Sequence, residues 1–442
     1  MRKYVHKLVD RGEMRIVDRE VDPRFELAAV VTRSQQESSR PILFRKVQGS
    51  ALPVVSNILG SADRMCELLG ATNGQLCQRW AAIMKTVDTM SDDYTRVVTA
   101  DPMVEGKVTG LPQITWREKD AGPYITAGVY LARDPETGVP NLSFCRTFMK
   151  SDLELVCCID PPHDLAQYQA KAEANGNPLD VAILIAPPPE VFIAACASVP
   201  IEVDELKIAA AIQGHPLAMR RCETVDLAIP AETEVVIEGR IRPNVRHAEG
   251  PFGEYLGYYG PKQDGGYVID VTAVRWREDA IFHGLLCGTA EDLTALDIAF
   301  ATRTYMALAS SMPGILDVTC NPMLYCTVVK IDKRYEGQAQ HVMLKTFAAN
   351  PNYNFACIVV DRDVDIRNLR EILSAFLTRG RIDKRIMIIP DVPGWDRSAN
   401  PTYAGRLGID ATMALGREAD FERAITPGAA ELHLSHYFGK KD

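Results

Sequence analysis

The feature that most constrains this chain is residues 249–254, Glu-Gly-Pro-Phe-Gly-Glu, followed at 255–259 by Tyr-Leu-Gly-Tyr-Tyr. Pro251 fixes its own φ angle and restricts Gly250, so this stretch cannot lie in a regular helix. The aromatic residues after it predict apolar surroundings, in which a carboxyl group keeps its proton toward neutral pH. Two carboxyl groups with different surroundings suit proton transfer, but a surface turn with two solvated acids fits these residues equally well.

Length and charge limit the classes of protein to which the chain can belong. It has 442 residues, of which 47% are hydrophobic and 24% charged, and its net charge is −9. This length predicts two to four domains with ample core. The negative charge argues against a surface that binds nucleic acid or anionic lipid. No apolar run approaches the ~18 residues of a membrane helix, and the first residues lack the apolar core of a signal peptide, so we expect a cytoplasmic protein without a membrane span.

The 11 cysteines show no CxxC spacing, and Cys157 and Cys158 are adjacent. A disulfide framework or a zinc ribbon would space them otherwise, so we interpret them as reduced, mostly buried small residues. Cys145 stands next to Arg146, and a catalytic thiol there is a minor alternative. The sequence has no GxGxxG motif after a strand and no P-loop, HExxH or GxSxG motif, so it does not support a Rossmann, P-loop, zincin or hydrolase fold.

Three regions of the chain differ in their hydrophobic pattern. Residues 1 to about 100 predict a mixed α/β unit. From about 110 to 290, period-2 alternation broken by Pro and Gly predicts a β-rich barrel or sandwich with two helical insertions. After a helix near 292–311, strands and helices alternate as in an open α/β sheet. The strands of the second region are expected at 124–131, 142–147, 153–159, 181–186, 235–242 and 268–276, and its helices at 164–175 and 204–213. In the third region, strands are expected at 325–331, 355–360 and 385–389, and helices at 338–348 and 366–379.

Arg146 ends a segment, residues 141–146, that alternates along a predicted strand. The alternation places Arg146 on the same face as Leu142 and Phe144. Such an arginine must either reach solvent or pair with a carboxylate, because a buried charge needs a partner. On this segment alone, an edge-strand arginine that reaches solvent is the commoner arrangement.

Asn141, His163 and Glu205 are candidate ligands for a divalent metal ion. His163 opens one predicted helix and Glu205 lies in the first turn of another, where either residue alone is more often a helix cap. Together the three residues would supply an amide oxygen, an imidazole and a carboxylate. That set suits Mn²⁺ or Mg²⁺, with phosphate or water completing the coordination. Their spacing in the sequence leaves open whether they converge.

Taken in order, several short motifs resemble the UbiD family of decarboxylases. These enzymes use prenylated FMN to interconvert unsaturated or aromatic carboxylic acids with their decarboxylated products. The resemblance runs almost from end to end, and the order and spacing of the motifs carry it. The motifs are Gly12-Glu13-Met14, Glu20-Val21-Asp22-Pro23, Asn57-Ile58-Leu59-Gly60-Ser61, residues 141–146, residues 249–254, Tyr335-Glu336-Gly337-Gln338-Ala339 and Gly408-Ile409-Asp410-Ala411-Thr412.

The resemblance implies a catalytic network of Arg146, Glu249 and Glu254. In this network Glu254 would deliver a proton to the carbon that loses CO₂, and it would need a raised pKa to do so. Arg146 would keep Glu249 ionised and orient the substrate carboxylate, for which its planar fork of donors is suited. The activity implied is a reversible, non-oxidative decarboxylation in which the modified flavin supplies the covalent chemistry.

The same resemblance implies a binding site for the cofactor and its ions. Mn²⁺ would be held beside the cofactor phosphate by Asn141, His163 and Glu205, with a K⁺ ion nearby whose ligands are not identified. The remaining contacts to the prenylated FMN would come from Phe144, Cys145 and Arg146, and from Lys333 or its competitor Lys330 at the phosphate.

The family fold implies a mixed α/β chain of three domains. A flavin-reductase-like split β-barrel at 109–300 would bind the cofactor, between α/β domains at 1–108 and 301–442, the last of which would serve in oligomerisation. The implied partners are a small carboxylic acid, CO₂, a flavin prenyltransferase that supplies the cofactor, and further copies of the chain in a homodimer or homohexamer.

Two alternatives and the choice of substrate remain open. The central barrel would also suit a plain-FMN oxidoreductase. The second alternative is a non-catalytic subunit that carries prenylated FMN, although a carrier has no use for a proton donor. Residues 288–311 are expected to line or gate the pocket. Leu296, Phe300 and Arg303 are the candidates there, and Arg303 would meet a second polar group of the substrate. A helix with its arginine in solvent is the commoner arrangement.

Overall fold

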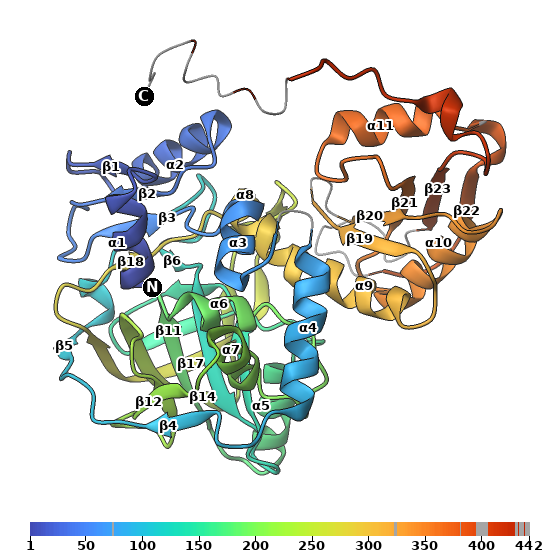
Figure 1. The fold of residues 1–442 in the computed structure, drawn as a ribbon. Helices are drawn as coiled ribbons and strands as arrows, with labels where there is room; N and C mark the ends of the chain where they lie inside the picture. The colour runs from blue at the N-terminus through green and yellow to red at the C-terminus, as the bar shows by residue number, and fades with distance from the viewer. Residues whose placement is uncertain are drawn as a thin grey trace.

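The computed structural model describes residues 1–72, 75–321, 325–380, 382–394, 405–428, 432 and 437. The end of the expected third domain, 301–442, therefore lies partly outside the described residues. Within them the chain forms a four-stranded sheet, a nine-stranded sheet and a five-stranded sheet, with two smaller sheets of three and two strands. Figure 1 shows the five-stranded sheet set apart from the body that holds the other two large sheets. Among the described residues, no helix combines the length and the apolar character needed to cross a membrane.

The N-terminal part packs helices on a four-stranded sheet (Figure 1). Its elements are α1 (Arg2–Asp10), β1 (Arg15–Val17), α2 (Glu26–Glu37), β2 (Ile42–Phe44), β3 (Val54–Ser56), α3 (Ala62–Leu69), α4 (Leu76–Thr89) and, from much later in the chain, β18 (Phe282–His283). In α1, Tyr4, Val5 and Leu8 are buried at helical spacing. Because β18 pairs in parallel with β3, this sheet also holds the segment that leads toward the third region.

The central part is built on a nine-stranded sheet that curls into a half-barrel (Figure 1). Its strands are β5 (Val104–Gly106), β6 (Tyr124–Ile125), β7 (Gly128–Arg133), β8 (Pro140–Phe144), β9 (Thr147–Met149), β10 (Glu154–Cys157), β11 (Leu179–Ile185), β14 (Val235–Glu249) and β17 (Gln263–Trp276). The order is β6-β9-β10-β17-β14-β11-β7-β8, and β5 pairs with β17. Between β14 and β17 the register shifts at three places, the last of them next to Glu249. Such bulges bend a strand and increase its twist, which turns the end of β14 away from the regular sheet.

Smaller elements of the central part complete its surface. They are β4 (Thr95–Val97), the 3₁₀ turn Val108–Gly110, α5 (Asp164–Ala174), α6 (Pro189–Ala194), α7 (Glu205–Gln213), β12 (Leu217–Arg221), β13 (Ala228–Pro230), β15 (Phe252–Gly253) and β16 (Tyr259–Gly260). Sequence patterns do not predict α6, since it begins at the end of a proline run. Proline is nevertheless well tolerated in the first turn of a helix, where its missing N–H is not needed.

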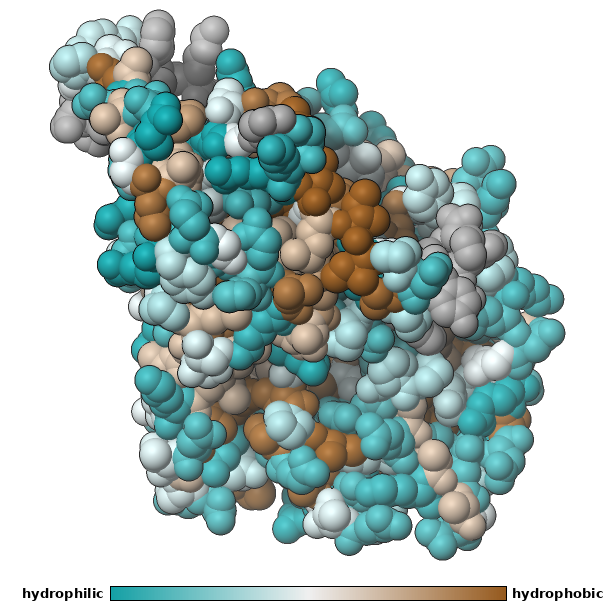
Figure 2. All heavy atoms as spheres, turned by 90° about the vertical axis from the view of Figure 1, so that its right-hand side faces the viewer, coloured by the Kyte–Doolittle hydropathy of each residue, from teal (hydrophilic) through white to brown (hydrophobic). Residues whose placement is uncertain are grey.

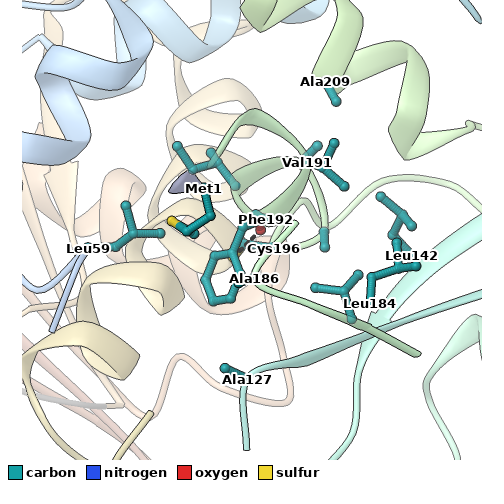
Figure 3. Packing of buried hydrophobic residues seen from close by; sticks show 14 of the residues in the cluster. Met1, Leu59, Ala127, Leu142, Leu184, Ala186, Val191, Phe192, Cys196 and Ala209 are labelled. Carbon is teal, nitrogen blue, oxygen red and sulfur yellow. Dashed lines mark hydrogen bonds between the residues drawn. The ribbon is translucent and has the colours of Figure 1, made fainter. Parts of the chain in front are cut away.

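The central sheet is buried on both faces, which explains the unbroken apolar run at 181–186. Alternate residues of a strand point to opposite faces. Ala182 and Leu184 pack into one hydrophobic cluster, and Val181, Ile183 and Ile185 pack into another. Figure 3 shows the first cluster, in which Leu184 lies near Phe192 of α6 and the cluster extends to Met1 and Leu59 of the N-terminal part.

The C-terminal part is an open α/β sheet, as its pattern predicted. Its elements are β19 (Ile315–Thr319), β20 (Cys326–Ile331), α10 (Gln338–Ala349), β21 (Ala356–Asp361), α11 (Leu369–Thr378), the 3₁₀ turn Ile382–Lys384, β22 (Ile386–Ile389), β23 (Arg406–Ala411) and the 3₁₀ turn Glu418–Phe421. The order is β19-β20-β21-β23-β22, in which β20, β21 and β23 are parallel and the two edge strands run antiparallel to their neighbours.

A single helical segment connects the central and C-terminal parts. It consists of α8 (Ala290–Leu296), a π-helical turn at Asp297–Ala301, and α9 (Thr302–Ala309). The expected helix near 292–311 is therefore present, but its middle is wound more widely than an α-helix. Turns of this kind are frequent at functional sites.

Candidate active site

Arg146 lies at a break in the sheet rather than inside a strand. The expected strand at 142–147 is wrong in this respect, because β8 ends at Phe144 and β9 begins at Thr147. The alternation along β8 therefore does not determine the direction of the Arg146 side chain. That side chain is only 7% exposed, so the solvent-reaching arrangement is also wrong, and Arg146 is paired with carboxylates instead.

Arg146 bridges the two glutamates that flank the Gly250-Pro251 turn. Its Nε donates to Glu249 Oε1 at 2.9 Å and its Nη2 donates to Glu249 Oε2 at 2.6 Å, while its Nη1 forms an ion pair with Glu254 Oε1. The contact with Glu249 is bidentate, the strongest arrangement available to an arginine and a carboxylate. The Tyr124 hydroxyl donates to Glu249 Oε1 at 3.1 Å.

The surroundings of these acids are apolar, and Tyr255, the first aromatic residue after the turn, lines the same cavity as Glu254. The later Tyr258 and Tyr259 are exposed at the surface. Further apolar contacts come from Phe252, whose ring centroid lies 5.1 Å from the Arg146 guanidinium carbon, and from Tyr124, which packs on Phe252.

A cavity of about 450 Å³ opens beside this network. Arg146 and Glu254 line it, whereas Glu249 is not among the described residues that do. Phe144 and Cys145 line the same cavity, and Phe144 meets Phe192 edge to face at 4.8 Å between ring centroids. Cavities of this size are typical of small-molecule sites.

The electrostatic surroundings shift the pKa values of Glu254 and Arg146. Burial raises the pKa of Glu254, and Arg146 offsets this only in part, while the charges of Glu249 and Asp292 raise it further. Burial is the largest influence on Arg146 and opposes its charge, but the hydrogen bond to Glu249 and the attraction of nearby Cys158, Glu254 and Glu249 together outweigh it and hold the Arg146 pKa above its ordinary range. The arginine therefore stays charged, and Glu254 favours its protonated form.

The structure brings Asn141, His163 and Glu205 to the wall of the same cavity. Asn141 Nδ2 donates to Glu205 Oε1 at 3.0 Å, and the backbone N–H of Leu142 donates to Glu205 Oε2 at 3.0 Å. His163 is the N-cap residue of α5, and it lines the cavity. Asn141 and Glu205 are thus in direct contact, and His163 lines the same cavity.

The chemistry of these three residues fits a divalent cation. Burial raises the pKa of Glu205 to about 8, against the backbone hydrogen bonds that lower it, and the charges of Asp204 and Asp164 add to the rise. Burial lowers the pKa of His163, which keeps its imidazole in the neutral form that binds metals. No group of three or more His, Cys, Asp and Glu side chains with metal-binding geometry occurs in the described part of the chain. A site here would accordingly depend on the Asn141 amide as its third protein ligand.

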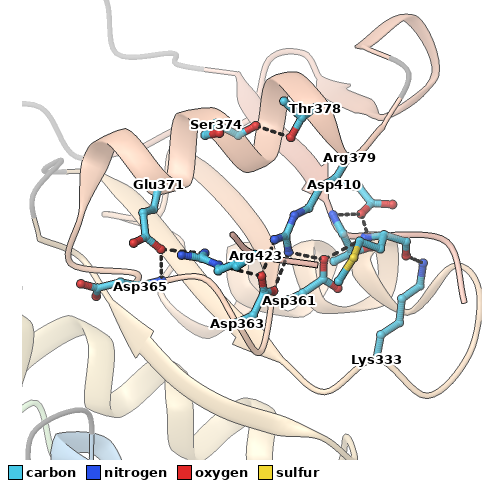
Figure 4. Close-up of polar contacts among 12 residues, drawn as sticks. Lys333, Asp361, Asp363, Asp365, Glu371, Ser374, Thr378, Arg379, Asp410 and Arg423 are labelled. Carbon is cyan, nitrogen blue, oxygen red and sulfur yellow. Dashed lines mark hydrogen bonds and ion pairs between the residues drawn. The ribbon is translucent and has the colours of Figure 1, made fainter. Parts of the chain in front are cut away.

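Lys333 is not brought together with these residues. Its Nζ donates to Glu336 Oε2 and to the Met413 carbonyl, both at 2.8 Å, and Figure 4 shows it beside a network of acids and arginines at the end of the C-terminal sheet. Neither Lys333 nor its competitor Lys330 is among the described residues that line the cavity. A contact between Lys333 and a phosphate stays a prediction.

The helical segment 290–309 forms another wall of the cavity and is held by buried acids. Glu291 Oε2 accepts from the Asn57 backbone N–H at 2.6 Å, and Glu291 Oε1 accepts from the Leu59 N–H at 3.0 Å and from His283 Nε2 at 2.9 Å. Further along, Asp297 accepts from Thr319 Oγ1 at 2.9 Å and from the Cys320 N–H at 2.6 Å. The segment is therefore fixed to the N-terminal part at one point and to the C-terminal part at another.

Sequence patterns missed several residues of this site. Glu291 and Asp292 are adjacent acids in the first turn of a helix, where acids commonly complement the helix dipole, so they gave no distinct signal. In the structure Glu291 faces the N-terminal part, while Asp292 lines the cavity and accepts from the Gly288 N–H at 2.8 Å. Leu296, Phe300 and Arg303 all line the cavity, as the sequence suggested, and Arg303 is also exposed to solvent.

Three family models match nearly the whole chain. They are the N-terminal domain (residues 5–84), the Rift-related domain (90–290) and the C-terminal domain (298–411) of 3-octaprenyl-4-hydroxybenzoate carboxy-lyase, UbiD. Among curated relatives, anhydromevalonate phosphate decarboxylase from Methanothermobacter thermautotrophicus is 31% identical over 433 residues, which cover 96% of this chain and 99% of the relative.

Solved structures agree with this result. The UbiD-class enzyme HmfF from Pelotomaculum thermopropionicum, in complex with FMN, superposes with a TM-score of 0.91 at 32% identity, covering 99% of both chains. An evolved dimeric form of the same enzyme, in complex with prenylated FMN, superposes with a TM-score of 0.87 at 31% identity, again covering 99% of both chains.

The chain belongs to the UbiD family of carboxy-lyases and is an enzyme of that class. This confirms the family and the mixed α/β fold class inferred from the sequence motifs.

Proposed function

We propose that this enzyme catalyses the reversible, non-oxidative decarboxylation of an aromatic, heteroaromatic or α,β-unsaturated carboxylic acid with prenylated FMN. One observation supports the proposal most directly. Arg146 and Glu254 line the cavity, whereas Glu249 holds Arg146 by two hydrogen bonds and is not among the described residues that line it. Bound prenylated FMN supplies the electron sink that CO₂ loss requires. The residues of the chain bind and orient the acid and move the proton.

Arg146 has donors left for a substrate carboxylate. A guanidinium carries five N–H groups, and three of those of Arg146 contact Glu249 and Glu254. The remaining N–H groups on Nη1 and Nη2 orient the carboxylate of the acid. Glu254, whose pKa is raised by burial, then delivers a proton to the carbon that has lost CO₂, and takes a proton from that carbon in the reverse direction.

Replacing the proposed proton donor tests this assignment. Glu254→Gln keeps the shape of the side chain but removes the acid, so we expect turnover of any accepted substrate to fall at least about 100-fold. The flavin absorbance of the purified protein should stay the same, since the substitution leaves the cofactor contacts in place. The exposed Glu136, exchanged for Gln in the same way, serves as the control. CO₂ release by Glu254→Gln at the wild-type rate would remove Glu254 from the acid role.

A panel of acids addresses the substrate and the alternative functions. Incubation of each acid in D₂O detects decarboxylation even when net turnover is small, because the carbon that has lost CO₂ takes up deuterium from the solvent-exchanged proton donor. Aromatic, heteroaromatic and unsaturated acids belong in the panel, and so does a phosphate-bearing acid, because the Methanothermobacter relative is named for a phosphate substrate. A plain-FMN oxidoreductase would show the spectrum of unmodified FMN after co-expression with a flavin prenyltransferase, and a carrier subunit would exchange none of the acids.

The metal proposal assigns Mn²⁺ to Asn141, His163 and Glu205, with K⁺ close by. The support for it is a buried carboxylate next to a neutral imidazole and an amide. We expect protein refolded in the presence of a chelator to lose most of its flavin, and Mn²⁺ added back to restore it. Absorbance at flavin wavelengths together with metal analysis measures both changes. Full flavin retention by metal-free protein would contradict the assignment.

The proposed partners include further copies of the chain, as a homodimer or homohexamer. A stripe of leucines on α11, Leu369, Leu373 and Leu377, is 39%, 44% and 61% exposed. These residues are spaced by four and so share one face of the helix. Figure 2 turns the C-terminal part toward the viewer and shows hydrophobic side chains gathered on this side of the molecule. Exposed apolar surface of this kind supports an interface between copies.

A further inference from the structure

A short segment of the central part, residues 117–121, lies against the turn that joins the two glutamates of the site. The backbone N–H of Gly253 donates to Asp120 Oδ1 at 2.9 Å. In the opposite direction, the backbone N–H of Ala121 donates to the Pro251 carbonyl at 3.1 Å. These two hydrogen bonds tie the turn to a part of the chain that lies 133 positions before it.

Asp120 is itself held in place by its own segment. Its Oδ2 accepts from the backbone N–H of Arg117 at 2.9 Å, and its own N–H donates to the Arg117 carbonyl at 3.1 Å. Each carboxylate oxygen of Asp120 therefore accepts one backbone N–H. Arg117 Nη2 donates to the Cys287 carbonyl at 2.9 Å, so the same segment also reaches the residues just before the helical segment 290–309.

The hydrogen bond from Gly253 matters because Glu254 is the next residue. Gly253 is buried, and a buried backbone N–H without an acceptor costs free energy. The N–H of Glu254 donates to the Tyr258 carbonyl at 2.9 Å, within the turn. A Cβ atom at position 253 would lie only 2.7 Å from the Arg117 Cγ, so the close approach of the two segments requires a glycine there. Asp120 thus fixes the backbone directly before the proposed proton donor.

We propose that Asp120 is a positioning residue for proton delivery, which holds the Glu254 carboxyl group at the cavity wall through its hydrogen bond with the Gly253 N–H. The inference rests on the proposed function, since it presumes that Glu254 is the proton donor. Asp120 is not among the described residues that line the cavity, so it acts through the backbone of the turn. Displacing a catalytic group by about 1 Å slows a reaction on the order of 100-fold, while the side chains that bind the substrate stay in place.

Backbone hydrogen exchange tests the contact without a substrate. In flavin-loaded Asp120→Ala, peptides that cover residues 249–260 should exchange at least about tenfold faster than in the wild type, because the turn loses an anchor. Asp152→Ala is the matched control, since Asp152 Oδ1 accepts from the Thr109 N–H at 2.8 Å and the variant loses the same kind of hydrogen bond. The control should leave exchange of the turn unchanged. Unchanged exchange of the turn in Asp120→Ala would overturn the proposal.

Kinetics separates positioning from a purely structural role. The assay follows benzoate, nicotinate and cinnamate, one acid from each proposed substrate class. For an accepted acid, kcat of Asp120→Ala should fall at least about tenfold with KM and flavin content unchanged. The solvent deuterium isotope effect on kcat should rise, because proton delivery becomes the slower step. Asp120→Asn, in which an NH₂ group replaces one acceptor oxygen, should show an intermediate loss and decides the question if Asp120→Ala does not fold. Wild-type kcat in these variants, or a loss confined to KM or flavin content, would overturn the positioning role.

A double variant shows whether Asp120 acts through Glu254. In the Glu254→Gln background, adding Asp120→Ala should lower kcat by less than about twofold, since the group that Asp120 positions is already gone. A full additional loss would place the effect of Asp120 elsewhere and contradict the proposal. Failure of the proposed function is seen separately. Wild-type CO₂ release by Glu254→Gln would refute the proton donor, whereas an active Asp120→Ala beside an inactive Glu254→Gln would refute only the positioning role.

Discussion

Glu249 and Glu254 are the same residue type five positions apart, and their surroundings give them different properties. Glu249 receives a bidentate contact from Arg146 and a hydrogen bond from Tyr124, away from the cavity lining. Glu254 lines the cavity, and burial raises its pKa. One acid thus fixes an arginine by a bidentate contact, and the other favours the protonated form that a donor needs.

Asp292 provides a test of this electrostatic arrangement. A proton donor with a raised pKa is active below that pKa, and its activity falls as the pH rises through it. Burial is the largest cause of the raised pKa of Glu254, and the negative charge of Asp292 adds to it. Asp292→Asn should therefore lower the Glu254 pKa and move the alkaline limb of the pH–rate profile to lower pH. A limb that stays in place, or moves to higher pH, would contradict the assignment of this limb to Glu254.

At the residue scale, local sequence patterns identified the charged groups, whereas only the family resemblance named Arg146 and Glu249 as partners. The turn at residues 249–254 was recognisable because glycine and proline restrict the backbone there. The pairing of Arg146 was not, since the break after Phe144 redirects its side chain and no local pattern encodes that break. Tyr124 was missed for the same reason, because its contact with Glu249 joins residues far apart in the sequence.

The helical segment 290–309 depends on two buried acids for its position. Glu291 is fully buried and accepts hydrogen bonds from the Asn57 and Leu59 backbones and from His283. Burial by itself would raise the pKa of Glu291, but His283 and the backbone donors outweigh it and the pKa is lowered. Its contribution to stability is therefore present above the ordinary carboxyl value of 4.5 and is lost as the pH falls through the lowered pKa.

Glu291→Ala should destabilise the fold. The substitution leaves two backbone N–H groups and His283 without their acceptor, so we expect the free energy of unfolding to fall by about 3 kcal/mol. Denaturant titration at neutral pH measures the change, with Glu136→Ala as the exposed control. Adding His283→Ala should cost less than its effect alone, since the two side chains form one pair. A loss below about 1 kcal/mol would show that the contact is not a major anchor.

Elements with a strong period were predictable, and their ends were not. Helices α5, α7, α10 and α11 were expected within a few residues of their bounds, because each buries one face at helical spacing. Strand β14 was expected to end at 242 but continues to Glu249. The extension is stabilised by pairing with β17 across bulges, which is a tertiary contact that period-2 alternation does not reveal.

On the scale of the whole molecule, the cavity lies between the central sheet, the helical segment 290–309 and a loop of the C-terminal part. The five-stranded C-terminal sheet has its own hydrophobic cores, with one face covered by α10 and another cluster under α11. The family to which the chain belongs could be inferred from motifs spread over the whole sequence. The contact of α8 with the N-terminal part could not be inferred, because it joins buried groups more than 200 residues apart.

The exposed leucines of α11 give a prediction at this scale. Leu373→Glu places a charge in the middle of the stripe, so we expect the dissociation constant between copies to rise at least about tenfold. Light scattering behind a sizing column measures the mass, and circular dichroism verifies that the fold is intact. Leu153→Glu, at an exposed leucine of the central part, is the control. An unchanged mass for Leu373→Glu would locate the interface elsewhere.

The hydrogen bonds from the Asn57 and Leu59 backbone to Glu291 have a consequence for exchanging parts of this chain between family members. None of the described cavity-lining residues comes from the first hundred positions of the chain, yet the wall that carries Asp292, Phe300 and Arg303 is anchored there. Exchanging residues 290–309 with those of another family member, in order to change substrate choice, would separate this segment from the backbone of residues 57–59 to which Glu291 is hydrogen-bonded. A functional chimaera would have to carry the donor's version of the 57–60 loop together with the helix.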